Sequence, residues 1–325
     1  MAMRGVNLGG WLVLEGWITP SLFEGTTATD EFTLCEQFGN RAAAQLNDHR
    51  QTFITEADFA WLAAHGIEAV RLPVGYWIFG DEPPFVDGLD YVDQAFAWAQ
   101  KHNLKVLLDL HGAPGSQNGW DHSGRSGLLG WHTQQRYIDR TVNALVHLAT
   151  RYGAHPQLWG IEVLNEPRWD VPKKILARFY ESAYAVIREH APESVAVVIS
   201  DSFRPHDWNR VLAAPTYKNV VLDRHFYQCF DDRDKALDMP GHLHKARSEW
   251  RAEVQKLQQR KPVIAGEWSL ALDGISNEQD WRSYADAQLE AFVDCAAWFF
   301  WTYKTEDSPE WDLRRSAKLL GLQPE

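Results

Sequence analysis

The stretch IEAVRLPVGYWIFGDEPPFVDGLDYVDQAFAWAQKHNLKVLLDLHG, residues 67–112, contains one complete repeat of the fold. Its two ends, IEAVRLPV (67–74) and LKVLLDLHG (104–112), are short apolar runs typical of buried strands. Between them, YVDQAFAWAQKHN (91–103) carries apolar residues at three- and four-residue spacing, which predicts a helix packed on one face. Strand, helix and strand in this order predict two parallel strands joined by a crossover helix.

The same alternation continues in both directions along the chain. Six more runs resemble strands: GVNLGGWLV (5–13), QLWGIEVLNEP (157–167), VAVVIS (195–200), NVVLDRHF (219–226), PVIAGEWS (262–269) and AAWFFWTYK (296–304). Four more segments have helical spacing: residues 136–153, 173–190, 244–260 and 280–295. Eight strands alternating with helices predict an α/β fold, a single (β/α)8 barrel of the TIM type that occupies residues 1–325 as one catalytic domain.

Composition and charge restrict the possible ligands. The net charge is −12, which disfavours nucleic acid, acidic membranes and acidic polysaccharides as partners. Aromatic residues make up 13% of the chain and include 16 Trp, more than core packing needs. Surplus Trp often lines sites whose ligands present flat apolar faces, as sugar rings do. A neutral or cationic ligand is therefore expected, and the sequence leaves the oligomeric state open.

Cysteine usage and the chain ends bear on the cellular compartment. Cys35, Cys229 and Cys295 lie far apart without CxxC spacing, so we expect reduced thiols rather than a disulfide framework or a zinc knuckle. No apolar run approaches the roughly 18 residues of a membrane span, no secretion signal precedes residue 5, and no N-x-[ST] sequon occurs. The chain as given is expected to be cytoplasmic, and secretion remains open if a signal has been removed.

Polar side chains stand where five of the predicted strands end. They are Arg71, His111, Asn165 with Glu166, His225, and Glu267. In a parallel barrel the carboxyl ends of all strands open at one mouth, which is where barrel enzymes place their catalytic residues. We therefore expect these side chains to meet there.

Glu166 and Glu267 are the candidate catalytic pair. Cleavage of a glycosidic bond needs one carboxylic acid to protonate the departing oxygen and one carboxylate to attack or to activate water. Carboxyl groups about 5–5.5 Å apart predict a retaining mechanism, and groups about 6.5–9.5 Å apart predict inversion. Helix capping or pairing with arginine is the alternative for either glutamate taken alone.

Neighbouring residues have plausible auxiliary roles. Asn165 is a candidate donor to a sugar 2-hydroxyl, and Arg71 is a candidate to keep a nucleophile ionised, the alternative for Arg71 being an ion pair inside the barrel floor. Further candidates for sugar binding are Tyr227 as a donor to the nucleophile, His111 and His225 for hydroxyls or for orienting the acid, Trp301 under a sugar ring, and Trp120 with Phe230 as a clamp for a second sugar. Ordinary structural packing is the alternative for each.

Seven motifs, in order, resemble glycoside hydrolase family five, and within it the branch of fungal exo-β-1,3-glucanases. They are GVNLGGWLVLEGWITPSLF, VRLPVGYW, DLHGAPGSQNGWDHSG, NEP, HFYQCF, GEWS and FFWTYKTEDSPEW, and they span nearly the whole chain. The resemblance implies a barrel and a retaining mechanism with Glu166 as general acid/base and Glu267 as nucleophile. It also implies a glucose subsite lined by Glu15, Arg71, His111, Asn165, His225, Tyr227 and Trp301, with Trp120 and Phe230 clamping the next sugar.

The chain departs from that branch at three points. The connection between GEWSLAL and the helix that contains QDWRSYADAQLEAF is short where the fungal enzymes carry a long loop, which predicts a wider and shallower site. The fungal enzymes are secreted and disulfide-bonded, and this chain shows neither feature. Trp120 stands where the fungal pattern usually has Phe. The substrate expected is a neutral β-glucan oligosaccharide or β-glucoside, with no cofactor and no metal.

Other functions remain as alternatives. A metal-dependent hydrolase is supported only by the pair His242 and His244, and the zinc-binding motif HExxH is missing. Serine hydrolase and nucleotide-binding motifs are missing. A non-catalytic carbohydrate-binding barrel would share the aromatic residues but has no use for two rim glutamates. Among hydrolases, an endo-β-glucanase or a β-glucosidase of another linkage is the alternative to exo-β-1,3 action.

Overall fold

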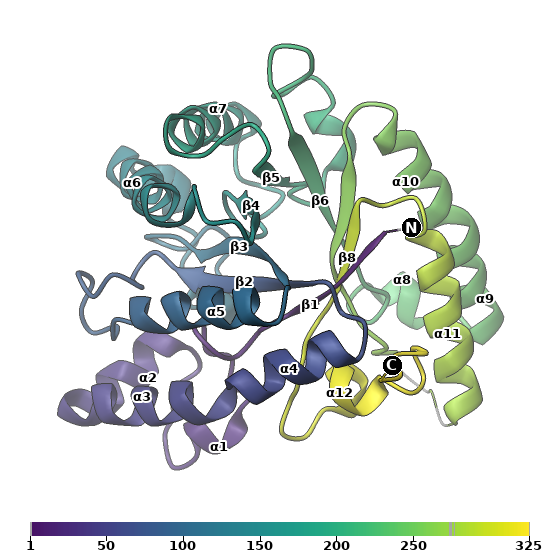
Figure 1. Ribbon diagram of the computed structural model, residues 1–325, viewed down its shortest axis with the longest axis horizontal. Helices are drawn as coiled ribbons and strands as arrows, with labels where there is room; N and C mark the ends of the chain where they lie inside the picture. The colour runs from purple at the N-terminus through teal and green to yellow at the C-terminus, as the bar shows by residue number, and fades with distance from the viewer. Residues whose placement is uncertain (1, 273–274, 276, 325) are drawn as a thin grey trace.

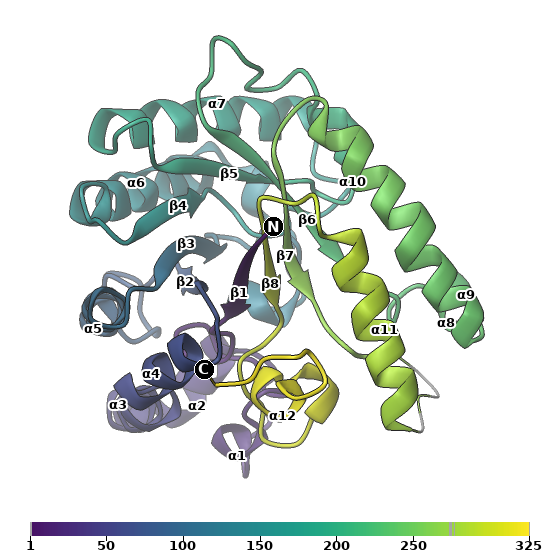
Figure 2. The same ribbon diagram turned by 45° about the vertical axis from the view of Figure 1, so that its right-hand side comes forward.

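The computed structural model describes residues 2–272, 275 and 277–324, and it confirms the predicted barrel. Eight parallel strands close on one another in chain order, and Figures 1 and 2 show the helices arranged around them. The strands are β1 (Met3–Asn7), β2 (Ala69–Gly75), β3 (Lys105–Gly112), β4 (Leu158–Glu162), β5 (Ala196–Ser200), β6 (Val220–Phe226), β7 (Val263–Trp268) and β8 (Ala297–Phe300). Strand β1 pairs with both β2 and β8, which closes the barrel.

The five helices predicted from apolar spacing are all present. They are α5 (Leu89–Lys101), α6 (Gln135–Tyr152), α7 (Lys173–His190), the segment of α9 (Met239–His244) that continues through a π-helical turn (Lys245–Trp250) into α10 (Arg251–Gln258), and α11 (Glu278–Ala291). Long β-then-α connections carry the shorter helices. Among them are α8 (Asp232–Lys235) after β6 and α12 (Leu313–Ser316) after β8.

Four helices between β1 and β2 were not predicted from the sequence. They are α1 (Pro20–Phe23), α2 (Glu31–Phe38), α3 (Ala42–Phe53) and α4 (Glu56–Ala64). The first three are short or weakly amphipathic, so apolar spacing gives little signal, and tertiary contacts hold them. The buried Arg50–Glu31 pair at 3.4 Å joins α3 to α2, and Trp77 also donates to Glu31 at 3.1 Å.

Three strands are much shorter than the apolar runs that predicted them, and one of these is β8, which ends at Phe300. Strand β1 ends at Asn7 because the chain turns at Gly9 and Gly10, where Gly10 has a φ of +74°. Strand β4 ends at Glu162, so Glu166 lies four residues past its end rather than on the strand. The carboxylate still faces the mouth, because a backbone φ of +43° at Glu166 turns the chain there.

The core follows the layers of the barrel. Leu107, Val198, Val221, Ile264 and Phe299 are among the buried residues of one cluster formed mainly by alternate strand positions. A second, larger cluster fills the space between the strands and the surrounding helices. Each strand is therefore apolar on both faces, as expected for a parallel barrel.

The structure also describes the cysteines, His242 and the length of the helices. Within the described part of the chain Cys35, Cys229 and Cys295 form no disulfide, and Cys35 and Cys295 are buried. His242 lies inside α9, is buried, and contacts the Gln228 side chain at 2.8 Å. None of the helices within residues 2–272, 275 and 277–324 combines the length and apolarity needed to cross a bilayer.

Candidate active site

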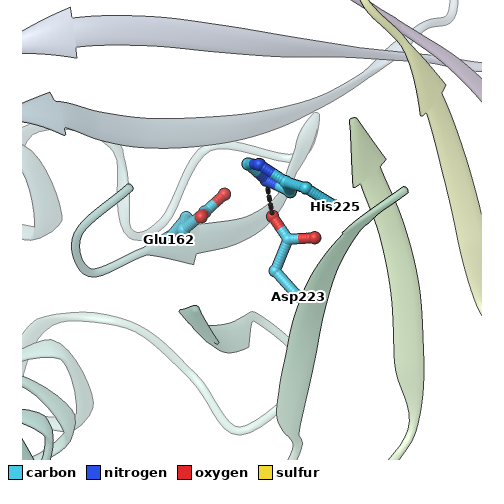
Figure 3. A group of neighbouring side chains, drawn as sticks. All are labelled: Glu162, Asp223 and His225. Atoms are coloured by element: carbon cyan, nitrogen blue, oxygen red, sulfur yellow. Dashed lines mark hydrogen bonds and ion pairs between the residues drawn. The ribbon is translucent and has the colours of Figure 1, made fainter. Parts of the chain in front are cut away.

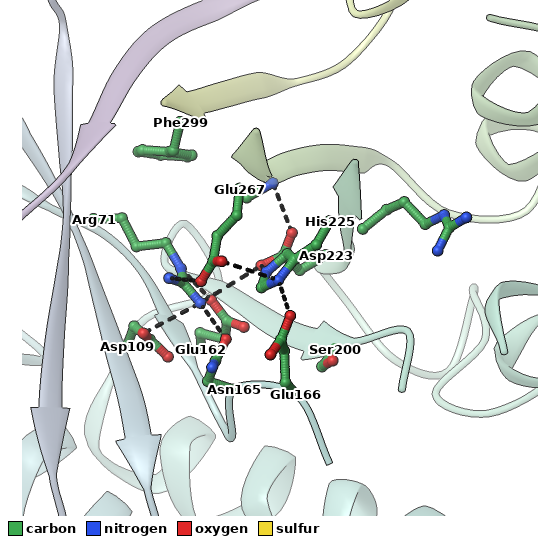
Figure 4. Close-up of polar contacts among 12 residues, drawn as sticks. Arg71, Asp109, Glu162, Asn165, Glu166, Ser200, Asp223, His225, Glu267 and Phe299 are labelled. Carbon is green, nitrogen blue, oxygen red and sulfur yellow. Dashed lines mark hydrogen bonds and ion pairs between the residues drawn. The ribbon is translucent and has the colours of Figure 1, made fainter. Parts of the chain in front are cut away.

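Arg71 is the hub of the polar cluster at the mouth of the barrel (Figure 4). It lies on β2 and is fully buried. Its Nη1 donates to Glu267 Oε1 at 3.0 Å, and its Nη2 donates to Asn165 Oδ1 at 2.8 Å. Because arginine stays charged at any working pH, it supplies a fixed positive charge beside Glu267.

Glu267, on β7, accepts hydrogen bonds at both carboxylate oxygens. Besides Arg71 at Oε1, the Tyr227 hydroxyl donates to Oε2 at 2.9 Å. Tyr227 directly follows β6, which pairs with β7, and Arg71 lies on β2, so two different strands position the two donors. Both donors orient the carboxylate and stabilise its ionised form.

Glu166 contacts two histidines. His225 Nδ1 lies 2.6 Å from Glu166 Oε1, and His122 Nε2 lies 3.5 Å from Glu166 Oε2. The other ring nitrogen of His225 lies 3.2 Å from Asp223 Oδ2. Since both His225 nitrogens face carboxylates, each donates, and the ring is an imidazolium in the empty site.

Glu166 and Glu267 are close enough to act on one bond. Together with a nitrogen of His225, one carboxylate oxygen from each lies within 4.8 Å of the others. Oxygens less than 4.8 Å apart are compatible with the carboxyl separation of about 5–5.5 Å typical of retaining enzymes, and they are close for the roughly 6.5–9.5 Å of inverting ones. His225 also lies 3.4 Å from Glu267, so the imidazolium bridges the two glutamates.

Electrostatics in the empty site distinguish the two glutamates. Burial raises the pKa of Glu166, but the charge of His225 and its hydrogen bond outweigh burial and lower that pKa to about 2. Burial raises the pKa of Glu267 to about 7 against the lowering effects of His225 and Arg71. The cluster therefore carries its readily exchanged protons on His225 and Glu267, and Glu166 is ionised until a proton reaches it.

His111 and Asn165 lie beside this cluster. His111 Nδ1 donates to Asp109 Oδ2 at 2.6 Å, and Asn165 Nδ2 lies 3.3 Å from His111 Nε2. An amide nitrogen can only donate, so His111 Nε2 accepts and the ring is neutral. Burial lowers the pKa of His111 well below its ordinary value, in agreement with that tautomer. The Trp301 ring stacks on His111 with centroids 5.4 Å apart.

Three acidic residues beneath the glutamates were not identified from the sequence. Glu162, Asp109 and Asp223 are buried, and Figure 3 shows Glu162 and Asp223 beside His225. Arg71 Nε donates to Glu162 at 2.8 Å, and Arg71 Nη2 lies 3.2 Å from Asp109. The motifs DLHG, GIEV and LDRH, each with one acid in an apolar run, were the available signal, since an acid there requires a buried partner.

His122 is a further residue that the sequence reasoning did not single out. It lies in a short 3-10 helix (Asp121–Ser123) after β3, and its ring centroid is 5.2 Å from that of His111. Its neighbour Trp120 was predicted to contact sugar, so position in that loop was the signal. The two residues place the loop after β3 over Glu166.

The remaining predicted residues lie around this cluster. Glu15 follows β1, is buried, and accepts a hydrogen bond from Trp17 Nε1 at 2.9 Å. Burial, with the charge of Asp121, raises the pKa of Glu15 well above its ordinary value. Phe230 is 67% exposed and packs edge-on against Tyr227. The short connection predicted after GEWSLAL falls partly on residues 273, 274 and 276, outside the described residues.

Two groups of side chains have the composition of a metal site. Glu162, Asp223 and His225 form one, and Glu166, His225 and Glu267 form the other. In both groups the carboxylates face cationic side chains, since Arg71 lies 2.8 Å from Glu162 and 3.0 Å from Glu267. The arrangement is suited to moving a proton between carboxylates and His225.

Residues 30–305 match the family model described as cellulase, glycosyl hydrolase family 5. The chain belongs to glycosyl hydrolase family 5. The family is one of enzymes, and the resemblance drawn from the sequence motifs is confirmed at this level.

Two relatives agree with family 5 membership, and one solved structure shares the fold. A glucan 1,3-beta-glucosidase of Blumeria graminis is 36% identical, with 99% of this chain and 87% of the relative covered. A probable glucan 1,3-beta-glucosidase A of Emericella nidulans is 40% identical, with 96% and 87% covered. The rutinosidase of Aspergillus niger shares the fold with a TM-score of 0.85 at 22% identity, covering 98% of this chain and 96% of that chain.

Proposed function

We propose that this family 5 protein is a retaining β-glucosidase that releases glucose from the non-reducing end of β-1,3-glucan oligosaccharides or from β-glucosides. The observation that carries the proposal is the pair Glu166 and Glu267, with oxygens within 4.8 Å of each other at the mouth of the barrel. A purely sugar-binding barrel has no need of two carboxylates at that spacing, each with its own set of donors.

In the first step, Glu267 attacks the anomeric carbon while Glu166 protonates the departing oxygen. The glycosidic bond breaks, a glycosyl ester forms on Glu267, and the leaving group departs as an alcohol. Arg71 and Tyr227 hold Glu267 as the carboxylate that attacks. In the second step Glu166 takes a proton from water, the water oxygen attacks the anomeric carbon, and Glu267 is released.

The proton for the first step comes from His225. His225 Nδ1 and Glu166 Oε1 are 2.6 Å apart, so the proton moves along an existing hydrogen bond. Bringing the weakly basic glycosidic oxygen to Glu166 excludes water from the charged pair and favours the neutral combination of histidine and carboxylic acid. After the second step the proton taken from water returns to His225, so the cycle is balanced.

The neutral glucan substrate is supported by the chain's charge and by its relatives. A net charge of −12 disfavours anionic glycans, and the relatives described above are named for action on glucan 1,3-beta linkages. Trp301, whose ring stacks on His111, is the aromatic side chain proposed to contact the sugar ring. Asn165 and Glu15 supply polar groups around it.

Product analysis tests linkage and direction of attack. The enzyme is incubated with laminari-oligosaccharides and, separately, with cello-oligosaccharides of equal length, and early products are separated by size. Glucose together with a chain shortened by one unit, formed faster from the β-1,3 series, is the expected result. Fragments from mid-chain cleavage, or activity on β-1,4 links alone, would contradict the proposed specificity.

A further inference from the structure

Three aromatic side chains form a contiguous patch on the rim of the barrel, on the loops after β3, β4 and β5. Trp120, Trp169 and Phe203 contact one another, and we call these three the rim aromatic cluster. Their ring centroids are 6.1 Å apart for Trp120–Trp169, 5.7 Å for Trp120–Phe203 and 5.7 Å for Trp169–Phe203. The planes of these rings cross at 51° to 85°, so the rings meet tilted or edge to face and do not stack on one another.

The rim aromatic cluster is exposed, which packing does not explain. Trp169 is 54% exposed and Phe203 is 36% exposed. Among the described residues the only exposed Trp or Phe side chains are these two and Phe230, and all three lie on loops at the catalytic mouth. Exposed aromatic rings gathered at one place mark a binding surface, whereas aromatic rings that merely pack a loop are covered.

The backbone holds Phe203 outward at a cost. Ser202 and Phe203 have φ values of +52° and +57°, a region that side chains other than glycine rarely adopt. Asp201 Oδ1 accepts the Phe203 amide at 2.8 Å and thereby fixes the turn. Strain kept in a loop at the mouth, where it exposes an apolar ring, indicates a role in binding rather than in folding.

Trp169 is held as firmly. The preceding Arg168 pairs with Asp170 through two hydrogen bonds of 2.8 and 2.7 Å and places its guanidinium 5.8 Å from the Trp169 ring. Arg168 also donates to the Asn118 carbonyl at 3.3 Å, which ties the loop after β4 to the loop after β3. A fixed ring loses little conformational entropy when a ligand stacks on it.

The cluster adjoins Glu166. Trp169 follows Glu166 by three residues, and the Trp120 ring lies 5.5 Å from His122, which in turn is 3.5 Å from Glu166. The proposed acid must stand beside the leaving-group oxygen. Rim residues next to Glu166 therefore lie on the leaving-group side of the site. The cluster therefore lies on the side toward which the rest of an oligosaccharide would extend.

We propose that Trp169 and Phe203 form a subsite for the third sugar of a β-glucan oligosaccharide, beyond the glucose that is released and the sugar next to it. This inference rests on the proposed function. A neutral sugar ring stacks on the exposed Trp169 and Phe203 faces through its apolar C–H surface, and Trp120 is shared with the preceding sugar. Longer substrates gain affinity that a disaccharide cannot reach.

The test compares kcat/KM for a trisaccharide and a disaccharide of the linkage that the wild-type enzyme prefers. We expect the wild type to favour the trisaccharide, and Trp169→Ala to reduce the ratio of trisaccharide to disaccharide kcat/KM by roughly fivefold to tenfold. Trp169→Phe retains a ring and should restore part of the ratio. Leu128→Ala, at another exposed apolar side chain of the loop after β3, is the matched control and should keep the wild-type ratio.

The outcomes separate this subsite from the proposed function. If the wild type cleaves neither an aryl β-glucoside nor any β-glucan oligosaccharide, the proposed function fails. If it cleaves them but shows equal kcat/KM for both lengths, or if Trp169→Ala leaves the ratio unchanged in a folded protein, only the third-sugar subsite fails. Thermal unfolding of each variant establishes that it is folded.

Discussion

At the residue scale, the different roles proposed for Glu166 and Glu267 rest on their different hydrogen-bond partners. Arg71 and Tyr227 donate to Glu267, whereas His225 and His122 face Glu166. Glu267 thereby has a fixed counter-charge in Arg71, whereas Glu166 has no arginine partner and has the shorter contact with His225, 2.6 Å against 3.4 Å. This is the difference that a nucleophile and an acid/base require.

Removing each glutamate should give different chemistry. Glu267→Ala is expected to reduce turnover of every substrate by several orders of magnitude, because each needs the nucleophile. Added azide should enter the vacated space and yield an α-glycosyl azide from an activated β-glucoside. Glu166→Ala should spare the first step for substrates with good leaving groups and give a β-glycosyl azide. Chromatography and NMR of the azide products check this, and exchanged anomers would reverse the two roles.

The acid limb of the pH profile should report Glu267. Its pKa of about 7, raised by burial, means that kcat/KM falls as the pH drops through that value and the carboxylate is protonated. Tyr227→Phe removes a donor to the ionised form, so the pKa of Glu267 rises further and the limb moves to higher pH. The alkaline limb should lie above the ordinary histidine range, because the surrounding carboxylates raise the pKa of His225 despite its burial.

Profiles of kcat/KM against pH for the wild type and Tyr227→Phe, measured with an aryl β-glucoside, provide the comparison. Tyr184→Phe is the control, since that hydroxyl accepts the Lys218 amide on the far side of α7. An acid limb that stays in place in Tyr227→Phe would show that Glu267 does not govern it.

At the element scale, strands β6 and β7 position His225 through a glycine. Gly266 precedes Glu267, and a Cβ at that position would lie 2.0 Å from Asp223 Oδ2. The Gly266 amide also donates to Asp223 Oδ1 at 2.8 Å. A close approach of backbone to carboxylate is therefore what this position requires.

Gly266→Ala should displace Asp223 and with it the His225 ring. We expect kcat on an aryl β-glucoside to fall by at least about tenfold, since a misplaced catalytic group costs heavily in rate. The matched control is Gly25→Ala on the loop after α1, where a Cβ meets nothing within 4 Å although φ is +74°. Kinetics alongside circular dichroism check the pair, and wild-type kcat in folded Gly266→Ala would refute this role of the glycine.

The strands and the helices differ in how well the sequence predicts them. All eight strands could be predicted, because a buried parallel strand is apolar on both faces and leaves a continuous run. The four helices between β1 and β2 could not; α2 and α3, for example, are joined by the buried Arg50–Glu31 pair, and such a pair leaves no periodic pattern. Glu166 was placed at a strand end but stands four residues beyond it, since apolar residues continue into the turn at Val163 and Leu164.

At the scale of the whole molecule, Arg71 connects most of the barrel. It contacts Asn7 on β1, Asp109 on β3, Glu162 on β4, Asp223 on β6 and Glu267 on β7. A sequence can show that an arginine stands among acidic residues but not which of them it meets. This is why the position of Glu166 and Glu267 at the mouth could be predicted and the acids beneath them could not.

Arg71→Leu should destabilise the fold by roughly 3–5 kcal/mol, because it leaves buried carboxylates without their counter-charge. The loss should be smaller at low pH. Burial already raises the pKa values of Asp109, Glu162 and Glu267 above their unfolded values, and without the arginine these pKa values rise further, so the folded protein binds more protons and gains stability as the pH falls. In the wild type burial already raises the pKa of Asp109 to about 7.

Denaturant unfolding of the wild type and Arg71→Leu tests this stabilisation by Arg71. The measurements are made at about pH 7.5 and about pH 5, which lie on either side of the raised carboxyl pKa. Arg247→Leu, which removes a surface pair with Glu290 at 2.9 Å, is the control and should cost about 1 kcal/mol or less. An Arg71→Leu protein as stable as the control would contradict the claim that Arg71 stabilises the fold by neutralising the buried carboxylates.

In the proposed retaining reaction Glu267 forms a glycosyl ester. The most direct measurement incubates the enzyme with an activated 2-deoxy-2-fluoro-β-glucoside and maps the modified peptide by mass spectrometry. We expect a mass increase of one fluoroglucosyl group, located on Glu267 and released slowly on adding an acceptor alcohol. A label on another carboxylate, or no label in an enzyme that releases α-glucose first from a β-glucoside, would contradict it.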